Sequence, residues 1–167
     1  PFMLEILPVD LGKIFVRNFN YTYLERSYTF HWVLDLDIKG FFDNIDHGLL
    51  IKALERHVKC EWAMLYIKRW LSVPYQLKDG TQIERTKGVP QGSVVGPILA
   101  NLFLHYVFDE WMRRNHSNIS FERYADDTIC HCVSLKQAEF ILRAIRKRFA
   151  ECKLELNEDK TKIVYCK

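Results

Sequence analysis

Hydrophobic and polar residues alternate along the chain on both sides of a short polar break at residues 125–127. The alternation runs through Ile119, Phe121 and Arg123 before the break and through Ile129, His131 and Val133 after it. A period of two about a polar turn is typical of a β-hairpin. The pattern therefore predicts a hairpin whose tip carries the adjacent carboxylates Asp126 and Asp127.

A second segment, from Phe30 to Ile38, is nearly continuous in apolar character, as in a buried central strand. Asp35 and Asp37 interrupt it, and alternation places both on the same face. Because an unpaired buried carboxylate costs several kcal/mol, at least one of them should meet a metal ion or a basic side chain. For Asp35, a position at an exposed strand end explains the sequence equally well.

Helical periodicity follows this strand. Asp46 is placed to cap a helix whose apolar positions are Leu50, Ala53, Leu54 and Val58. A second helix begins near Glu61 and ends before Pro74, and its apolar positions are Met64, Leu65, Ile67, Trp70 and Leu71. The Asp-Gly turn signal within residues 75–83 predicts a small hairpin.

The second half of the chain alternates helices and strands. A loop rich in Gly and Pro, residues 87–93, precedes a long helix that runs to about Arg113. Glycines before a helix N-terminus allow backbone N–H groups to approach an anion. Ser134 and Gln137 form a capping-box pattern for another helix, and Thr161–Tyr165 is a final strand. Residues 1–30 show no clean periodicity, and we expect only some helix or extended chain there.

The order of these elements predicts the fold class. Without the small hairpin it is βαββαβ, an α+β layer in which an antiparallel sheet has helices packed on one face. The first strand then lies beside the central hairpin. Asp37 would face Asp126 and Asp127, although the positions are distant in sequence.

Composition restricts the classes of protein. The 167 residues are 49% hydrophobic with a net charge of +3, which suits one folded domain and permits nucleic-acid binding. Five cysteines without a Cys-x-x-Cys pair indicate reduced thiols and a cytoplasmic protein. Cys130-His131-Cys132 has no second ligand pair at zinc-finger spacing, and alternation points His131 away from both cysteines. No membrane span or cleavable signal is visible.

Two charged features leave alternatives open. Asp126 and Asp127 are either ordinary solvated turn residues or oxygen ligands that hold Mg²⁺. The basic positions of the helix after Ser134 form either a solvated surface or a face that contacts phosphates; they are Lys136, Arg143, Arg146, Lys147 and Arg148.

Four blocks of sequence together resemble the palm of reverse transcriptases, and most of all that of bacterial group II intron-encoded enzymes. They occur in family order between about residues 33 and 167. The blocks are Leu34-Asp35-Leu36-Asp37-Ile38-Lys39-Gly40-Phe41-Phe42-Asp43-Asn44-Ile45-Asp46-His47, Lys87-Gly88-Val89-Pro90-Gln91-Gly92-Ser93 with residues 97–101, Arg123-Tyr124-Ala125-Asp126-Asp127, and Leu154-Glu155-Leu156-Asn157 with residues 160–162.

The resemblance implies an RNA-directed DNA polymerase that uses two Mg²⁺ ions, with Mn²⁺ as an alternative. The implied catalytic residues and metal ligands are Asp37, Asp126 and Asp127, with the backbone carbonyl of Ile38 as a weaker ligand. One metal would activate the primer 3′-hydroxyl and the other would stabilise the leaving pyrophosphate. Alignment of the first block favours Asp37 over Asp35.

The resemblance also implies substrate-binding residues. Phe41 would lie under the incoming sugar and reject a 2′-hydroxyl. Gln91 and Gly92 would contact the nucleotide, and Tyr124 and Ala125 would line the primer end. Lys162 resembles the family's lysine near the triphosphate. The implied partners are an RNA template, a DNA or RNA primer, dNTPs and, for a longer parent protein, intron RNA.

The chain also departs from the family. Residues 1–30 match the fingers poorly, whereas 31–167 match the palm, with a small fingers-type hairpin near 75–86. The first and last residues, Pro1 and Lys167, suggest a fragment without a thumb, so we expect weak or no activity of the isolated chain and self-association through exposed surface. Alternatives are a non-catalytic RNA-binding module, a structural palm without activity, and a retron or CRISPR-associated reverse transcriptase.

Overall fold

The structure is a computed structural model that describes residues 30–90 and 92–166. The contacts divide the chain into two compact units. Within the described residues, the first unit is Gly40–Phe103 and the second joins residues 30–39 to residues 104–166. The expectation for the first 29 residues, and any role of Gln91, lie outside the described residues.

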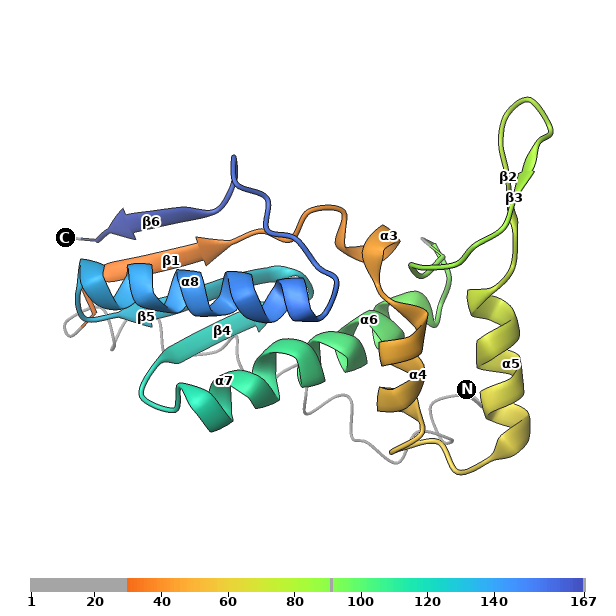
Figure 1. Cartoon of the computed structure of the whole chain (residues 1–167), viewed down its shortest axis with the longest axis horizontal. Coiled ribbons are helices and arrows are strands. Elements are labelled where there is room, and N and C mark those ends of the chain that lie inside the picture. Colours follow the sequence, from red (N-terminus) through yellow and green to blue (C-terminus); the bar gives the residue numbers. More distant parts are fainter. Residues whose placement is uncertain (1–29, 91, 167) are drawn as a thin grey trace. The chain divides into compact units, whose positions relative to one another are not determined.

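The second unit contains a four-stranded antiparallel sheet (Figure 1). Its strands are β1 (Trp32–Leu36), β4 (Ser120–Tyr124), β5 (Asp127–Cys132) and β6 (Lys162–Tyr165). The strand order is β4-β5-β1-β6, so the strand that carries the first acids lies directly beside the central hairpin. The predicted neighbourhood of the two is confirmed.

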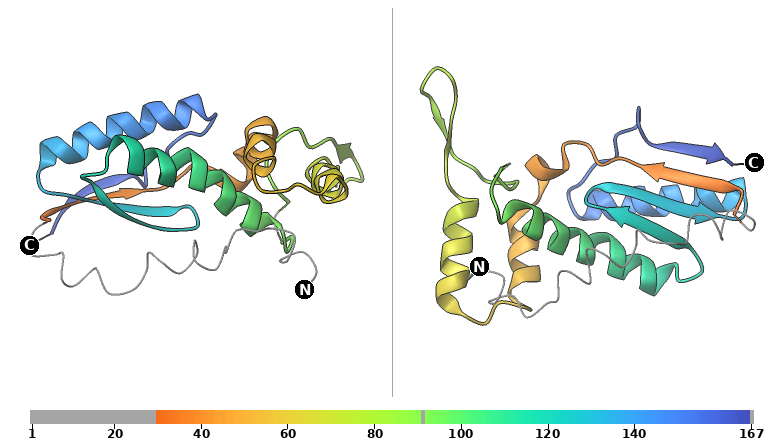
Figure 2. Two further views of the ribbon diagram at one scale, coloured as in Figure 1. Left: turned by 90° about the horizontal axis from the view of Figure 1, so that it is seen from below. Right: turned by 180° about the vertical axis from the view of Figure 1, so that it is seen from behind.

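Helices cover one face of this sheet, as predicted. Helix α8 (Leu135–Glu151) and the segment η1–α7 (His105–Asn115) lie on the same side of the strands (Figure 2, left). Phe108 is fully buried between the two layers, and its ring contacts those of Phe121 and Phe149 at centroid distances of 5.0 and 6.1 Å. Burial of one such side chain contributes about 2–3 kcal/mol. The α+β class is confirmed.

The long helix predicted between residues 93 and about 113 is divided in the structure. Helix α6 (Gly96–Leu104) is followed by a π-helical turn, η1 (His105–Asp109), and then by α7 (Glu110–Asn115). A π-turn contains one residue more than an α-turn, and hydrophobic periodicity alone does not reveal it. Asp109 ends this turn and is only 3% exposed.

The first unit contains three short helices before α6 and a small hairpin. They are α3 (Phe41–Asn44), α4 (His47–Leu54), α5 (Glu61–Leu71), β2 (Tyr75–Gln76) and β3 (Gln82–Ile83). The predicted cap of α4 is confirmed, because Leu49 N–H donates to Asp46 Oδ1 at 2.9 Å. The predicted hairpin is confirmed as well, with Gly80 at φ +90° in its turn.

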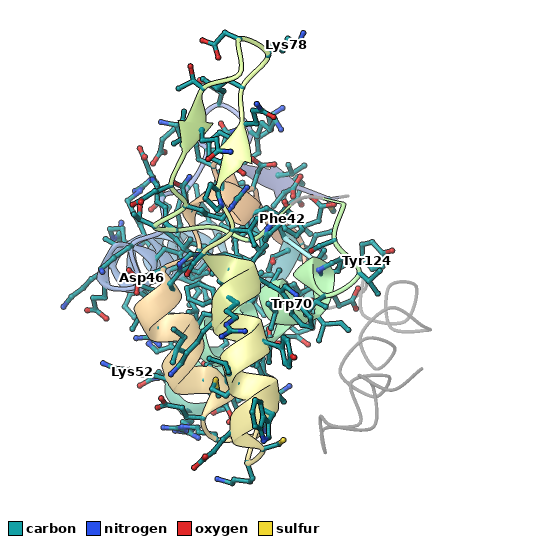
Figure 3. All side chains as sticks on the ribbon, turned by 90° about the vertical axis from the view of Figure 1, so that its right-hand side faces the viewer. Phe42, Asp46, Lys52, Trp70, Lys78 and Tyr124 are labelled. Atoms are coloured by element: carbon teal, nitrogen blue, oxygen red, sulfur yellow. The ribbon has the colours of Figure 1, made fainter. Side chains whose placement is uncertain are left out.

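The predicted apolar face of α5 is only partly correct. Ile67 and Leu71 are buried, but Leu65 and Trp70 are 37% and 38% exposed. The five apolar positions spread over more of the helix circumference than one packing partner covers. Trp70 is labelled on α5 in Figure 3.

Among the described residues, no helix combines the length and the apolar character that a membrane crossing requires.

Candidate functional site

Three acidic residues gather at one end of the sheet in the second unit. Asp37 follows the last residue of β1, Asp126 lies in the turn between β4 and β5, and Asp127 begins β5. The antiparallel register pairs Leu36 with Thr128, which places the end of β1 next to the start of β5. The topology thus brings together the acids that the sequence analysis selected.

The three carboxylates influence one another electrostatically. The pKa of Asp126 is raised above its ordinary value, first by burial and then by the negative charges of Asp127 and Asp37. The positive charge of Lys160 acts in the opposite direction. Like charges held this close favour a nearby cation.

The backbone of Asp37 is held by the segment Asn157–Thr161. Asn157 N–H donates to the Asp37 carbonyl at 2.8 Å, and Asp37 N–H donates to Thr161 Oγ1 at 3.4 Å. Lys160 Nζ, from the same segment, lies 3.4 Å from Asp37 Oδ1. One short segment therefore fixes the position of this acid and supplies a cation to it.

A buried ion pair, Asp109 with Arg123, holds the turn that carries Asp126. Ala125 has φ +54°, a left-handed conformation that non-glycine residues rarely adopt. Its carbonyl accepts a 2.7 Å hydrogen bond from Arg123 Nη1. Arg123 also donates to both carboxylate oxygens of Asp109, at 2.8 and 2.7 Å. The guanidinium thus links the π-turn to the acidic hairpin tip.

Burial alone would raise the pKa of Asp109, but its bonds to Arg123 and His105 outweigh burial and hold the pKa below the ordinary value. Both side chains of the Asp109–Arg123 pair are about 5% exposed or less. Asp109 was not among the candidate site residues expected from the sequence. The signal that could have found it is an acid inside an otherwise apolar helical stretch.

The acidic cluster has the donor chemistry of a divalent-cation site, although its geometry is not that of a closed ligand shell. Within residues 30–90 and 92–166, no three His, Cys, Asp or Glu side chains are close enough to hold a metal ion as they stand. Carboxylate oxygens are nonetheless the ligands that Mg²⁺ prefers. The ammonium group beside Asp37 shows that this position accepts a cation. The residues present therefore fit the metal that the resemblance implies.

The first unit brings the second half of the first block, residues 40–47, together with the block at residues 87–93. Gly88 N–H donates to the Ile45 carbonyl at 2.7 Å, and Val89 N–H donates to the Phe42 carbonyl at 2.8 Å. Gly88 has φ +79°, and a Cβ there would lie 2.8 Å from the Phe42 and Asp43 carbonyl oxygens. Only glycine allows this close approach between the loop and the end of α3.

The predicted nucleotide-contacting residues lie in different environments. Phe41 is 2% exposed, and its ring contacts Phe42 and Phe103 at centroid distances of 5.3 and 6.5 Å. Gly92 has φ +80° and open space where a Cβ would lie. Tyr124, labelled in Figure 3, is 54% exposed at the end of β4.

The strand register separates two neighbouring lysines. Lys162 pairs with Asp35 across β1 and β6, whereas Lys160 is the lysine whose ammonium group reaches Asp37. The role expected of Lys162 stays a prediction, and Lys160 is a residue that the sequence analysis missed. Ile38 is 4% exposed and forms a bridge with Leu156.

The basic face of α8 is partly engaged within the second unit. Arg146 pairs with Glu158 at 2.8 Å, and Arg148 Nε donates to the Val107 carbonyl at 3.0 Å. Lys136, Arg143 and Lys147 are exposed. The choice between a solvated face and a phosphate-contacting face stays open for those three.

Comparison with known sequences identifies related proteins. Residues 11–167 match the family described as "Reverse transcriptase (RNA-dependent DNA polymerase)". The putative COX1/OXI3 intron 1 protein of Saccharomyces cerevisiae is 34% identical over 82 residues, which are 49% of this chain and 10% of that protein. The group II intron-encoded protein LtrA of Lactococcus lactis subsp. cremoris is 38% identical over 74 residues, 44% of this chain and 12% of LtrA. The matched regions are thus about a tenth of these relatives.

A solved structure shares the fold. Telomerase from Candida albicans, determined with a fragment of telomeric RNA, superposes with a TM-score of 0.62 at 16% sequence identity. The match covers 84% of this chain and 29% of the telomerase chain. This likeness agrees with the α+β layer expected from the order of elements and with the palm fold that the resemblance implies.

Proposed function

This chain belongs to the reverse transcriptase family, and from that premise we propose that it forms the nucleotidyl-transfer palm of an RNA-directed DNA polymerase of the group II intron type. The observation that carries the proposal is the gathering of Asp37, Asp126 and Asp127 at one end of neighbouring strands. Reverse transcriptases generally use divalent metals, and the donor set found here suits them.

The three acids are the proposed ligands and catalytic residues, and the Ile38 carbonyl is a further candidate ligand. These residues would hold a pair of Mg²⁺ ions, or Mn²⁺ in their place, which would supply activation of the primer 3′-hydroxyl and charge neutralisation at the leaving pyrophosphate. The protein's own contribution is positioning. The Asn157–Thr161 segment holds Asp37, and Arg123 holds the Ala125 turn.

The remaining contacts are proposed from the family blocks. Phe41 limits the space beside the incoming sugar and so selects dNTPs, while Gly92 leaves the loop backbone open to the nucleotide. Tyr124 and Ala125 line the primer end. Lys162 is the proposed triphosphate contact. RNA template, DNA or RNA primer and, in a longer parent protein, intron RNA are the proposed partners.

Metal binding tests the proposal directly. Mn²⁺ is titrated into the chain, and its binding is followed by water-proton relaxation for the wild type and for the Asp37→Asn/Asp126→Asn double variant. We expect saturable binding in the wild type that is lost in the double variant, because the two acids are ligands of one site. A matched control, Glu61→Gln/Asp79→Asn, removes two exposed acids of the first unit and should leave binding unchanged.

Equal binding by the wild type and the double variant would contradict a shared metal site.

Primer extension by the longer parent protein provides the second readout. There Asp126→Ala should abolish metal-dependent dNTP incorporation while the circular dichroism spectrum stays native. If the Asp126→Ala variant still incorporated dNTPs, the assignment as a polymerase would be wrong.

A further inference from the structure

A polar cleft of about 710 Å³ lies in the first unit and contains none of the three acids of the second unit. It is formed by the end of α3, the hairpin strands and the segment that follows β3. The lining residues are Asp43, Asn44, Tyr75, Ile83, Glu84, Arg85, Thr86 and Lys87. Its volume falls within the range of about 300–1,000 Å³ that is typical of sites for small ligands.

Arg85 has an unsatisfied donor in this cleft. Its Nε is buried and has no hydrogen-bond acceptor among the described residues. The guanidinium carbon lies 5.2 Å from the centroid of the Tyr75 ring. A buried N–H without an acceptor is costly in a folded protein, so such a group calls for a specific explanation. Arg85 also lines the cleft, so its guanidinium is the positive group that an anion in the cleft would meet.

The other lining residues indicate what kind of anion fits. Lys87 Nζ donates to Asn44 Oδ1 at 2.7 Å and adds a second positive charge. Asp43 and Glu84 bring two exposed carboxylates, so the cleft as a whole does not favour a simple inorganic anion. A nucleotide carries both complementary features, because its phosphate suits Arg and Lys and its base amino groups suit carboxylates.

The aromatic ring points to the single-stranded form of nucleic acid. Unpaired bases stack on aromatic side chains and on guanidinium planes, whereas bases inside a duplex are not available for stacking. Tyr75 is 43% exposed and already has Arg85 against its ring. We propose that the cleft between α3 and the β2–β3 hairpin binds one or two nucleotides of single-stranded RNA, with the phosphate on Arg85 and a base near Tyr75. The inference rests on the proposed function, since it assigns an RNA contact to the same protein.

The experiment compares two charge-removing variants on one hairpin. Arg85→Gln removes the cleft guanidinium, and Lys78→Gln removes an exposed charge at the hairpin tip, which Figure 3 shows apart from the hairpin base. Binding of a fluorescent single-stranded RNA 12-mer to the full 167-residue chain is measured by anisotropy in EDTA at several salt concentrations. We expect about tenfold weaker binding for Arg85→Gln. Its log–log salt slope should fall by about 0.7, as for one lost phosphate contact.

Lys78→Gln should stay within about twofold of the wild type, since it lies outside the cleft. Arg85→Lys keeps the charge and should recover part of the loss. Equal affinities and slopes for Arg85→Gln and Lys78→Gln would overturn the proposal. So would an Arg85→Gln effect that is as large for duplex RNA as for single strands.

Crosslinking of RNA to the wild-type chain tests the same contact without a variant, so misfolding of a variant cannot affect the result. RNA that contains 4-thiouridine should crosslink to the peptide that spans residues 75–87, and crosslinks found only elsewhere would overturn the proposal. The absence of metal separates this test from that of the polymerase site. The loss expected for Arg85→Gln in EDTA does not depend on whether the acids of the second unit bind Mn²⁺, so the two proposals can fail separately.

Discussion

The ammonium group of Lys160 lies 3.4 Å from the carboxylate of Asp37. The two residues come from opposite ends of the second unit's sequence and are brought together by the hydrogen bonds of Asn157 and Thr161 to the Asp37 backbone. Lys160 thus places a positive charge beside the acidic cluster, next to one of the proposed metal ligands.

Replacing Lys160 should strengthen metal binding. In Lys160→Gln the incoming Mn²⁺ no longer meets a positive charge near Asp37, and a gain of about 1 kcal/mol, roughly fivefold in affinity, is expected. Lys147→Gln removes a charge from the exposed surface of α8 in the same unit and serves as the control. Mn²⁺ relaxation titration measures both. Weaker binding by Lys160→Gln would show that the lysine supports the metal instead of competing with it.

The acidic cluster should cost stability in the absence of metal. The pKa of Asp126 is raised in the folded state by burial and by Asp127 and Asp37. Stability from this group is therefore highest below the unfolded pKa and falls as the pH rises through the folded pKa. Asp126→Asn should stabilise the metal-free chain at pH 7, by less than about 1 kcal/mol because solvent screens the site.

Urea denaturation in EDTA at pH 7 and at pH 3 measures this effect. The gain of Asp126→Asn should shrink as the pH falls and be largely lost below the ordinary carboxyl pKa of 3.8, where the wild-type carboxyl is mostly protonated in both states. The exposed Asp159→Asn is the matched control. A gain that is equal at both pH values would argue against charge repulsion as its cause.

Breaking the buried ion pair should destabilise the second unit strongly. Asp109→Asn leaves the Arg123 guanidinium without its carboxylate, and loss of one partner of a buried pair costs about 3–5 kcal/mol. Glu110→Gln, one residue along and paired with Arg113 and Arg114 nearer the surface, should cost about 1 kcal/mol or less. Thermal denaturation compares the stability of the two variants. Similar losses of stability would mean that the buried pair contributes no more than the exposed one.

The Asp109–Arg123 pair should also make the stability of the chain fall at acidic pH. The pKa of Asp109 is depressed in the folded state, so its contribution is present above the unfolded pKa and is lost as the pH falls through the folded pKa. Asp109→Asn should therefore lower stability at pH 7 more than at pH 3. An equal loss at both values would indicate a packing defect.

The cysteines should differ sharply in reactivity. Burial raises the pKa of the Cys132 thiol to about 11 and raises that of Cys130 as well, whereas Cys60 is exposed. Because the thiolate is the reactive form, a thiol reagent at pH 8 should label Cys60 first and Cys130 and Cys132 only after unfolding. Peptide mass spectrometry follows the sites, and early labelling of Cys130 would contradict the packing of β5 against the helices.

Several parts of the fold could be predicted because their signals are local. The caps at Asp46 and Ser134 depend on side chains that bond to N–H groups three residues away, and period-two alternation marks the β4–β5 hairpin. Element order then sufficed to place β1 beside β5. The apolar positions of α5 were a less reliable signal, since apolar residues also occur on helix surfaces.

The sequence by itself determined the family and the fold class, and it selected the three acids as candidates, because motif blocks and periodicity depend only on the order of residues. Only the tertiary structure decided that Lys160 meets Asp37 while Lys162 pairs opposite Asp35, since the register between β1 and β6 is a relation between distant segments. It also decided that a π-turn buries Asp109 against Arg123. Electrostatic partners and burial depend on distances in space, which one-dimensional patterns do not specify.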